Sequence, residues 1–522
     1  MNFRFVINQL GLLLIVLSAI LGGVALWEIY EYWQGAHLEL ISMEAMIASA
    51  GVGLCAGGGM WYLGRGAATK IGRREALLLV ALSWLVGAAL SGLPYFLWAV
   101  IHHSTAPTPI VETGGPAHPF LNYIDCYFEA MSGLTTTGAT VLSEIESLPR
   151  GLLLWRAITH WLGGLGIVVL FVAVLPTVGA GGKKLFLIEA PGPTPTGVKP
   201  RIKDTARILW FIYVGLTIAQ TVALRLCGMS WFDALCHTMA TLATGGFSTR
   251  NASVGDYNLA SVIVIIFFMV LAGANFGLYY QIIRGSWRNV LADTEMRAYL
   301  LLLTAGSLIV VASLVAAQQP LPLTTGDQHE PSIARALEQG VFTTVSIQTT
   351  TGFCTGDFNT WPFLAQATLI GLMFIGGCAG STAGGIKVVR IWVAIKIIYT
   401  ELERVFNPNV VRPTRLGGSG SIKDDLKLSV MIYCFGIILL FAIGAVAIKV
   451  IEGDACDFTT AATASVATLC TIGPGLGQIG AIENYGWMTS SSKVVLSLWM
   501  ALGRLEVFAI LVLLLPRFWR TE

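Results

Sequence analysis

Four short segments rich in threonine and glycine recur along the chain, each between long apolar stretches. They read TTTGA at 135–139, LATGG at 242–246, TTTGF at 349–353 and CTIGP at 470–474. Glycine permits backbone conformations that turn carbonyl oxygens to one side, and threonine adds hydroxyl oxygens. Rows of such oxygens can replace the water around a dehydrated cation. The chemistry that these segments predict is therefore cation coordination.

The segments recur at a nearly constant spacing. Their central glycines, Gly138, Gly245, Gly352 and Gly473, lie 107, 107 and 121 residues apart (245 − 138, 352 − 245 and 473 − 352). A regular period of this kind indicates repeated architecture. Each repeat reads as an apolar span, a short re-entrant helix, an extended loop with the glycine, and a second span. An acid is expected to open each short helix, with Asp125, Asp233, Glu338 and Asp457 as the candidates.

The composition indicates a polytopic, all-α membrane protein. Of 522 residues, 55% are hydrophobic and only 12% are charged, against about 25% charged in soluble proteins, and the mean hydropathy is +0.72. The net charge of +2 arises from basic residues in short runs between apolar segments, which does not indicate a nucleic-acid partner. Nine cysteines without paired spacing do not predict a metal site or a disulfide framework.

The apolar runs predict ten membrane crossings, one of them broken, because about 20 apolar residues span a bilayer as a helix. They lie at 5–27, 40–63, 76–101, 152–178, 208–227, 259–283, 298–317, 363–398, 428–450 and 493–515. Basic residues are concentrated in alternate loops, which predicts that both termini are cytoplasmic. The first run is too long for a signal-peptide core and is expected to be retained as a helix.

Two crossings in each repeat return the chain to its starting side, so all four repeats share one orientation. Parallel repeats can form a ring around an axis along the membrane normal. Non-helical backbone at membrane depth is tolerated where it lines a watery cavity, and four glycine loops around one axis meet that condition. Close helix packing through small residues is the alternative for any single segment.

Two further features could control such a pathway. The run GGCAGSTAGG at 376–385 holds five glycines in ten residues, and each costs a helix about 1 kcal/mol relative to alanine. This run is expected to break the span, although close helix packing is an alternative. Arg504 lies twelve residues from both Ser492 and Pro516, roughly 18 Å from each end of a straight helix. We expect it to face a cavity, contact the 376–385 loop and set a barrier to cations, with a purely structural pairing as the alternative.

The motifs SGLTTTGAT, LATGGFSTRNAS, TTTGFCTGDFNTWP, GGCAGSTAGGIK and GRLE (503–506) resemble the Trk/Ktr/HKT superfamily of potassium transporters over residues 76–516. The resemblance implies four parallel M1-P-M2 units (helix, pore helix and loop, helix) around a pore, in a bacterial cytoplasmic membrane. On this chain the units are 71–182, 183–290, 291–420 and 421–522, after an extra N-terminal helix pair at 1–70. The resemblance also implies a homodimer and a cytoplasmic, TrkA-type nucleotide-binding regulator.

The resemblance further implies that K⁺ is the transported ion, with no organic cofactor in this chain. The coordinating residues would be Thr136, Thr137, Gly138, Ala243, Thr244, Gly245, Thr350, Thr351, Gly352, Thr471, Ile472 and Gly473. The gate would consist of Gly376, Gly377, Gly380, Ser381, Thr382, Gly384, Gly385 and Arg504. Ala243 and Ile472 interrupt an otherwise regular set of threonines, so K⁺ is expected to be favoured over Na⁺ less strongly than by four identical filter loops.

Other functions are less well supported by the sequence. A symporter coupling K⁺ to H⁺ or Na⁺ would need a mid-membrane carboxylate, and Glu129 and Glu506 are the candidates. A membrane scaffold would have no use for four matching glycines. No nucleophile-elbow, metalloprotease or Walker motif occurs, so no enzyme is expected. Lys387 and the basic 400–427 segment could dock a regulator or simply follow the positive-inside rule.

Overall fold

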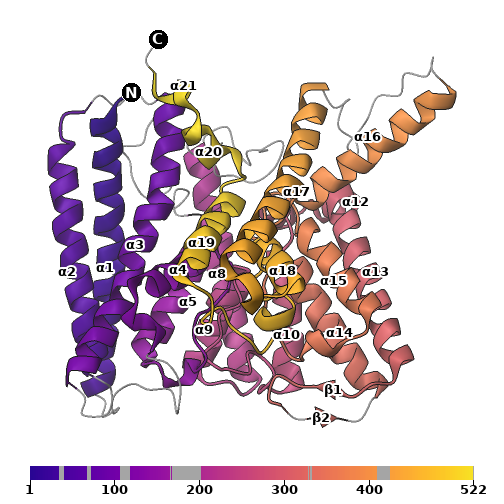
Figure 1. Ribbon diagram of the computed structural model, residues 1–522, viewed down its shortest axis with the longest axis horizontal. Helices are drawn as coiled ribbons and strands as arrows, with labels where there is room; N and C mark the ends of the chain where they lie inside the picture. Colours follow the sequence, from indigo (N-terminus) through magenta and orange to yellow (C-terminus); the bar gives the residue numbers. More distant parts are fainter. Residues whose placement is uncertain are drawn as a thin grey trace.

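A computed structural model describes residues 1–33, 40–67, 72–105, 118–164, 166, 202–326, 328–329, 332–407 and 424–520. Within these ranges the protein is predominantly helical, and long apolar helices cross it from end to end (Figure 1). The one sheet among the described residues pairs β1 (Leu321–Pro322) with β2 (Gln328–His329). The expected all-α, multi-pass architecture is thus confirmed.

Eight of the ten predicted crossings correspond to long helices or bent helix pairs in the described chain. Six are single helices: α1 (Phe3–Trp33), α2 (Leu40–Leu63), α3 (Arg73–Thr105), α8 (Ile202–Leu226), α13 (Thr294–Ala317) and α17 (Asp424–Glu452). Two are bent pairs: α10 (Leu259–Ala272) with α11 (Phe276–Ile283), and α19 (Ser490–Arg504) with α20 (Phe508–Leu511).

The other two predicted crossings are described in part or in pieces. Helix α5 (Arg150–Gly164) covers the first half of the run at 152–178, and most of the second half lies outside the described residues. The run at 363–398 forms α15 (Phe363–Ile375) and α16 (Val388–Phe406), which residues 376–387 separate. The break that its glycines predicted is therefore present.

The prediction of a single broken span is wrong, because two more spans bend sharply. Helices α10 and α11 meet at 94°, where Asn275 accepts a hydrogen bond from Gly277 N and so begins a new helix. Helices α19 and α20 meet at 112°, where Glu506 and Val507 take φ values of 52° and 63°. Arg504 consequently ends a helix, and the straight helix expected to pass through it does not exist.

Four short helices lie between the spans, as the repeat predicted. They are α4 (Tyr123–Leu134), α9 (Trp231–Leu242), α14 (Ile333–Gln348) and α18 (Phe458–Leu469). Three of the four acids expected to open them lie at a helix start: Asp457 caps α18, and Asp125 and Asp233 lie in the first turns of α4 and α9, whereas Glu338 lies inside α14. The caps of α4, α9 and α14 are Asn122, Ser230 and Ser332. Their side-chain oxygens accept from backbone N–H groups of the first turn, which is the same capping chemistry.

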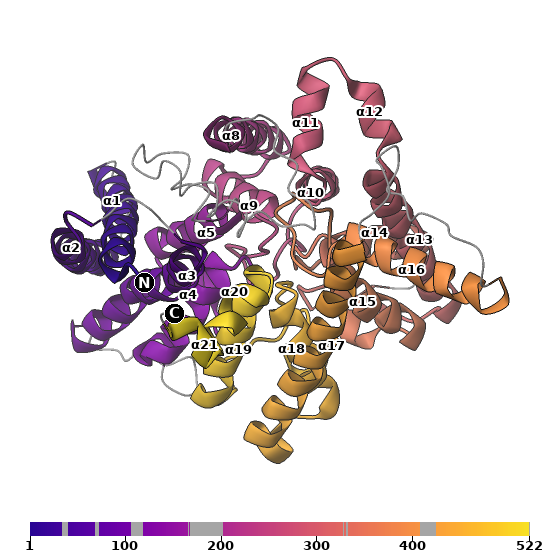
Figure 2. The ribbon, with the colours of Figure 1, turned by 90° about the horizontal axis from the view of Figure 1, so that it is seen from above.

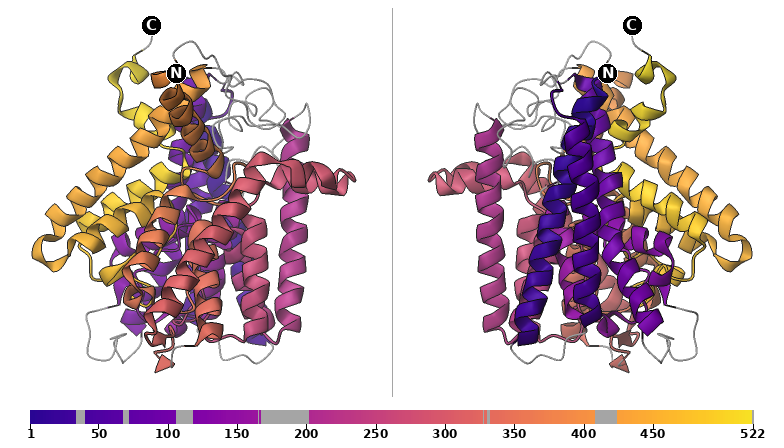
Figure 3. Two further views of the ribbon diagram at one scale, coloured as in Figure 1. Left: turned by 90° about the vertical axis from the view of Figure 1, so that its right-hand side faces the viewer. Right: turned by 90° about the vertical axis from the view of Figure 1, so that its left-hand side faces the viewer.

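The N-terminal pair α1 and α2 packs along α3 at one side of the molecule (Figures 1 and 3). The two helices approach closely because they present glycines to each other. A Cβ on Gly11 would overlap the backbone of α2, and one on Gly57 would crowd the carbonyl oxygen of Gly11. Small residues at membrane helix contacts commonly have this role.

The remaining elements are short. They are α12 (Trp287–Ala292), α21 (Pro516–Trp519) and the 3₁₀ turns η1 (Pro119–Leu121), η2 (Ile145–Ser147), η4 (Phe358–Thr360), η5 (Gly453–Ala455), η6 (Gly477–Ile479) and η7 (Val512–Leu514). Helices α11 and α12 project sideways from the body (Figures 2 and 3). Both termini lie at the same end of the molecule (Figure 1), and the side of the membrane that this end faces stays a prediction.

Candidate ion-coordination site

The four short helices end in one and the same turn. The residue after each helix bonds through its N–H to the carbonyl four residues earlier, and the next residue is a threonine with a left-handed backbone. These threonines are Thr136, Thr244, Thr350 and Thr471, with φ values of 55°, 55°, 56° and 53°. A glycine with positive φ follows two positions later: Gly138, Gly246, Gly352 and Gly473. We call 136–138, 244–246, 350–352 and 471–473 the ring segments.

This conformation corrects the register predicted for the second segment. Gly246, with φ 79°, is the counterpart of Gly138, and Gly245 takes the middle position. Hydrogen bonds agree, because the middle residues Thr137 and Gly245 donate to the carbonyls of Ser132 and Ala240, each five residues earlier. Ala243 therefore ends a helix and does not belong to the segment. All four segments begin with threonine, and their middle residues are Thr137, Gly245, Thr351 and Ile472.

The ring segments contact one another in cyclic order. A Cβ added to Gly138 would overlap the carbonyl oxygen of Gly245, and one on Gly246 would overlap that of Thr351. In the same way Gly352 lies against the carbonyl oxygen of Ile472, and Gly473 against that of Thr137. Each glycine thus packs on the middle residue of the next segment, and the fourth segment returns to the first. The four short helices accordingly surround the middle of the molecule (Figure 2).

Side chains behind the ring differ between segments. Thr135 and Thr137 share a hydroxyl hydrogen bond of 2.7 Å, and Thr349 and Thr351 share one of 2.8 Å. The corresponding pairs in the second and fourth segments are Ala243 with Gly245 and Cys470 with Ile472. The first and third segments are therefore braced by hydroxyl pairs that the other two lack.

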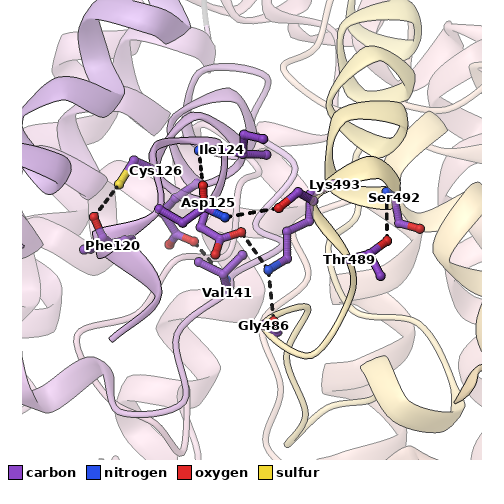
Figure 4. Close-up of polar contacts among 12 residues, drawn as sticks. Phe120, Ile124, Asp125, Cys126, Val141, Gly486, Thr489, Ser492 and Lys493 are labelled. Carbon is purple, nitrogen blue, oxygen red and sulfur yellow. Dashed lines mark hydrogen bonds and ion pairs between the residues drawn. The ribbon is translucent and has the colours of Figure 1, made fainter. Parts of the chain in front are cut away.

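A buried ion pair joins the first and fourth repeats near the start of α4 (Figure 4). Lys493 Nζ lies 2.6 Å from Asp125 Oδ1 and donates to the carbonyl of Gly486 at 2.9 Å. The side chains of Lys493 and Asp125 are only 3% and 9% exposed. Buried opposite charges stabilise a contact only as a pair, so this interaction fixes α4 against α19.

Residues 376–387, which we call the inner loop, lie against the ring segments. Gly384 N donates to Thr350 Oγ1 at 2.7 Å, and a Cβ on Gly384 would overlap the hydroxyl of Thr471. Thr382 Oγ1 donates to the carbonyls of Leu242 and Ala272 at 2.9 and 3.2 Å. The predicted loop therefore meets the threonines at the start of two ring segments.

The inner loop depends on its glycines for this path. Gly376, Gly380 and Gly385 have φ values of 73°, 73° and 74°, which residues with a Cβ adopt only at a cost. Gly377 lies close to the carbonyl oxygen of Gly273, which accepts from Cys378 N at 2.8 Å. Ser381 Oγ donates back to the carbonyl of Cys378, which closes the turn.

Arg504 contacts both the inner loop and the first ring segment. Its Nη1 donates to the Thr382 carbonyl at 2.9 Å and to Thr136 Oγ1 at 3.1 Å. Its Nη2 donates to the carbonyls of Gly163 and Gly164 at the end of α5. The predicted contact with the loop is present, and it places a guanidinium beside the ring.

The expected docking role of Lys387 does not agree with its position. Lys387 is 4% exposed, and its Nζ donates to the carbonyl of Ala383 inside the inner loop. The basic 400–427 segment is described only to Asn407 and from Asp424 onward. Two neighbours of the loop were not anticipated: Glu295 accepts from Ala379 N at 2.6 Å, and Arg390 pairs with Glu506 at 2.6 Å. In the sequence these residues look like ordinary charges near helix ends, so nothing there predicts their contact with the inner loop.

The two carboxylates considered for proton coupling are both paired with arginine. Glu129 lies 2.8 Å from Arg156, with the two side chains 0% and 1% exposed, and it also accepts from Val141 N and Thr140 Oγ1. Glu506 pairs with Arg390. Each carboxylate is therefore engaged by an arginine and has a structural contact to maintain.

Among the described residues no group of three or more metal-ligating side chains occurs, and all nine cysteines are free. His237 has local hydrogen bonds to the Asp233 carbonyl at 2.8 Å and Ser248 Oγ at 2.9 Å. His160 differs, since neither of its ring nitrogens finds a hydrogen-bond partner among the described residues.

Comparison with known proteins gives a consistent result. The family model described as "TrkH: Cation transport protein" matches residues 86–520. The chain is 37% identical to the Trk system potassium uptake protein TrkH of Salmonella typhimurium, over 100% of both chains. It is 33% identical to the Trk system potassium uptake protein TrkG of Escherichia coli, over 90% of both.

A solved structure agrees with these relatives. The crystal structure of the potassium transporter TrkH from Vibrio parahaemolyticus superposes with a TM-score of 0.82 at 32% identity, covering 100% of both chains. Family membership also agrees with the expectation of a transport protein without enzymatic function. The chain belongs to the TrkH family of cation transport proteins.

Proposed function

We propose that the protein is the membrane subunit of a potassium uptake system and conducts K⁺ through a gated pore lined by the four ring segments. The observation that carries this proposal is the cyclic packing of Gly138, Gly246, Gly352 and Gly473 on the carbonyls of the next segment. A closed ring of backbone oxygens suits a dehydrated monovalent cation. Potassium is favoured because the relatives are named as potassium uptake proteins.

Conduction would rely on backbone oxygens and helix ends. The carbonyls of 136–138, 244–246, 350–352 and 471–473 replace water around K⁺, and the hydroxyls of the leading threonines add oxygens at the inner edge. The short helices direct their C-terminal ends, which carry partial negative charge, toward the ring. The unlike middle residues, Gly245 and Ile472 beside two threonines, support weaker discrimination against Na⁺ than four identical loops would give.

The inner loop and Arg504 would form the gate. Both contact ring threonines, the loop through Gly384 and the arginine through Thr136. In this position the loop obstructs the path and the guanidinium repels a cation leaving the ring, since unit charges a few ångströms apart interact by about 1–4 kcal/mol in partly hydrated surroundings. Opening requires the loop to leave its hydrogen bonds with Leu242 and Ala272.

The proposal includes an assembly and an orientation. Four parallel M1-P-M2 units would surround the pore, with the pair α1–α2 outside them. The protein would work as a homodimer in the bacterial inner membrane, with both termini cytoplasmic and a TrkA-type nucleotide-binding regulator at the cytoplasmic end. The basic residues near the end where the termini lie support this orientation, and Arg74 there donates to the carbonyl of Arg520 at 2.8 Å.

Single-pore recording of purified protein in liposomes tests this function. With K⁺ as the only permeant cation, a K⁺ gradient alone should drive current that reverses at the K⁺ Nernst potential at every proton gradient. A reversal potential that shifts with pH would instead indicate coupling to H⁺, and K⁺ uptake that stops when Na⁺ is absent would indicate coupling to Na⁺. The arginine partners of Glu129 and Glu506 count against that alternative.

A further inference from the structure

His160 occupies an unusual position behind the second ring segment. It lies on α5, in the first repeat, and is fully buried. Its ring stacks on Phe247, with centroids 4.1 Å apart and the planes inclined by 20°. A Cβ added to Gly245 would overlap the imidazole, since it would lie 2.5 Å from Nδ1 and 2.6 Å from Cγ. The imidazole therefore occupies the space that a side chain at position 245 would take.

This space is filled differently in the other ring segments. Threonine or isoleucine occupies the middle position there, and in the first and third segments that threonine bonds to a second threonine. The second segment has neither hydroxyl, because its residues are Ala243 and Gly245. Something else must support its backbone, and the imidazole is in contact range.

The counterpart of His160 in the fourth repeat is apolar. His160 lies three residues before Gly163, which approaches the Leu134 carbonyl at the end of α4; Gly503 approaches the Leu469 carbonyl at the end of α18 in the same way. Counting back three residues from Gly503 gives Met500, which is fully buried. A methionine in the fourth repeat thus takes the place that the histidine has in the first.

The imidazole belongs to a layered stack that is itself anchored. Arg156 lies over the opposite part of this stack, with its Cζ 4.0 Å from the Phe247 ring centroid. Arg156 also donates to the carbonyl of Ser248 at 3.2 Å and pairs with Glu129. Phe247 directly follows the ring glycine Gly246, so the stack holds the second segment from its C-terminal side as well.

We propose that His160 is a positioning residue for ion selectivity: its imidazole replaces the missing side chain of Gly245 and holds that residue's carbonyl oxygen in the ring. This inference rests on the proposed function. It follows that positions 160 and 245 are complementary in size: a large side chain at 160 accompanies a glycine at 245. The summed volume of the two side chains then determines how closely the second segment approaches Gly138.

Substitutions that move side-chain volume from position 160 to position 245 test whether the two residues are complementary. Gly245→Ala alone should push the segment inward and lower the K⁺/Na⁺ permeability ratio several-fold, because φ at 245 permits alanine and the three atoms nearest to the new Cβ all belong to the imidazole. His160→Ala alone should leave a cavity behind the segment and also lower the ratio. The double variant should recover most of the ratio and of the melting temperature, because the new methyl group enters the vacated space.

Two further variants make the test decisive. His160→Met, with a side chain of similar size, should keep most of the selectivity. Gly246→Ala should lose it and should not be rescued by His160→Ala, since its Cβ would meet the backbone of Thr351. An unchanged ratio in His160→Ala, or a double variant no better than its parents, would overturn the inference. A wild-type protein without K⁺ preference would overturn the proposed function instead, while the melting temperatures would still report whether the pair is complementary.

Discussion

The ring segments and the inner loop are both non-helical, rich in glycine and largely buried, yet they are held in different ways. Each ring glycine lies against a backbone carbonyl of the next segment, so backbone contacts backbone in a closed cycle. The inner loop is held by individual hydrogen bonds, such as those from Thr382 Oγ1 to Leu242 and from Arg504 to Thr382. Shifting one ring segment disturbs all four, whereas the loop can release a few bonds in turn.

On the proposed function, this difference would separate selectivity from gating in energetic terms. A hydrogen bond contributes about 0.5–1.5 kcal/mol net, so the contacts of the loop would sum to a barrier that a regulator could overcome. The ring contacts cannot be broken one at a time in this way, because the close approach of each glycine to a carbonyl leaves no room for intermediate positions. The following predictions test whether ring and loop respond as differently as their contacts imply.

The largest effect is expected from Gly352→Ser. A Cβ there would overlap the Ile472 carbonyl, and φ at this position is 81°. The substitution should therefore remove most of the preference for K⁺, measured as the K⁺/Na⁺ permeability ratio in liposomes. Gly371→Ser is the matched control, because Gly371 lies on α15 of the same repeat with nothing within 4 Å of an added Cβ. Retained preference in Gly352→Ser would refute the assignment of the ring.

Breaking the ion pair between Asp125 and Lys493 should lower stability without changing gating. Asp125→Asn leaves a buried ammonium unpaired, which typically costs about 3–5 kcal/mol. We expect a lower melting temperature in detergent and an unchanged open fraction in recordings of the folded protein. Adding Lys493→Met should restore part of the lost stability. Equal melting temperatures for Asp125→Asn and wild type would contradict a structural role for this contact.

Replacing Arg504 by alanine should raise K⁺ flux on the order of tenfold, since removing about 1.4 kcal/mol from a barrier has that effect. The guanidinium lies beside Thr136, and on the proposed function a cation would have to pass this charge. Initial rates of K⁺ uptake into liposomes measure the change. Arg504→Lys keeps a positive charge and should stay near the wild-type rate. Unchanged or abolished flux in folded Arg504→Ala protein would exclude the barrier.

Thr382→Val should have the smallest effect, a rise in K⁺ flux of a few-fold. It removes the hydroxyl, whose single proton is shared between the carbonyls of Leu242 and Ala272, while keeping the shape of the side chain. The lost hydrogen bond is worth about 1 kcal/mol. Thr368→Val, on the exposed face of α15, removes a comparable hydroxyl bond and should leave the flux unchanged. A change in the K⁺/Na⁺ ratio in Thr382→Val would show that loop and ring are not separate.

Much of this arrangement could be predicted from the sequence. The period of the TTTG segments located the four short helices and their turns, and the five glycines at 376–385 located the inner loop. These predictions succeeded because glycine and threonine carry strong local preferences that a single chain displays. The predicted register of the second segment was wrong because two glycines, Gly245 and Gly246, are adjacent there. Only their backbone conformations reveal that Gly246 is the counterpart of Gly138.

Features fixed by distant contacts could not be predicted. The bend after Arg504 has no glycine or proline; it forms where Glu506, with positive φ, pairs with Arg390 from another repeat. Lys387 resembles any lysine that follows a span, and only the path of the inner loop makes it buried. The position of His160 behind Gly245 likewise results from a contact between two repeats, which the sequence does not predict.

The contact between Thr137 and Gly473 joins the first ring segment to the last one synthesised. Until the fourth segment has left the ribosome, the carbonyl of Thr137 has no glycine beside it. A partly made chain therefore lacks the fourth set of coordinating oxygens. On the proposed function, the complete ring of oxygens exists only after the final unit of the chain has been made.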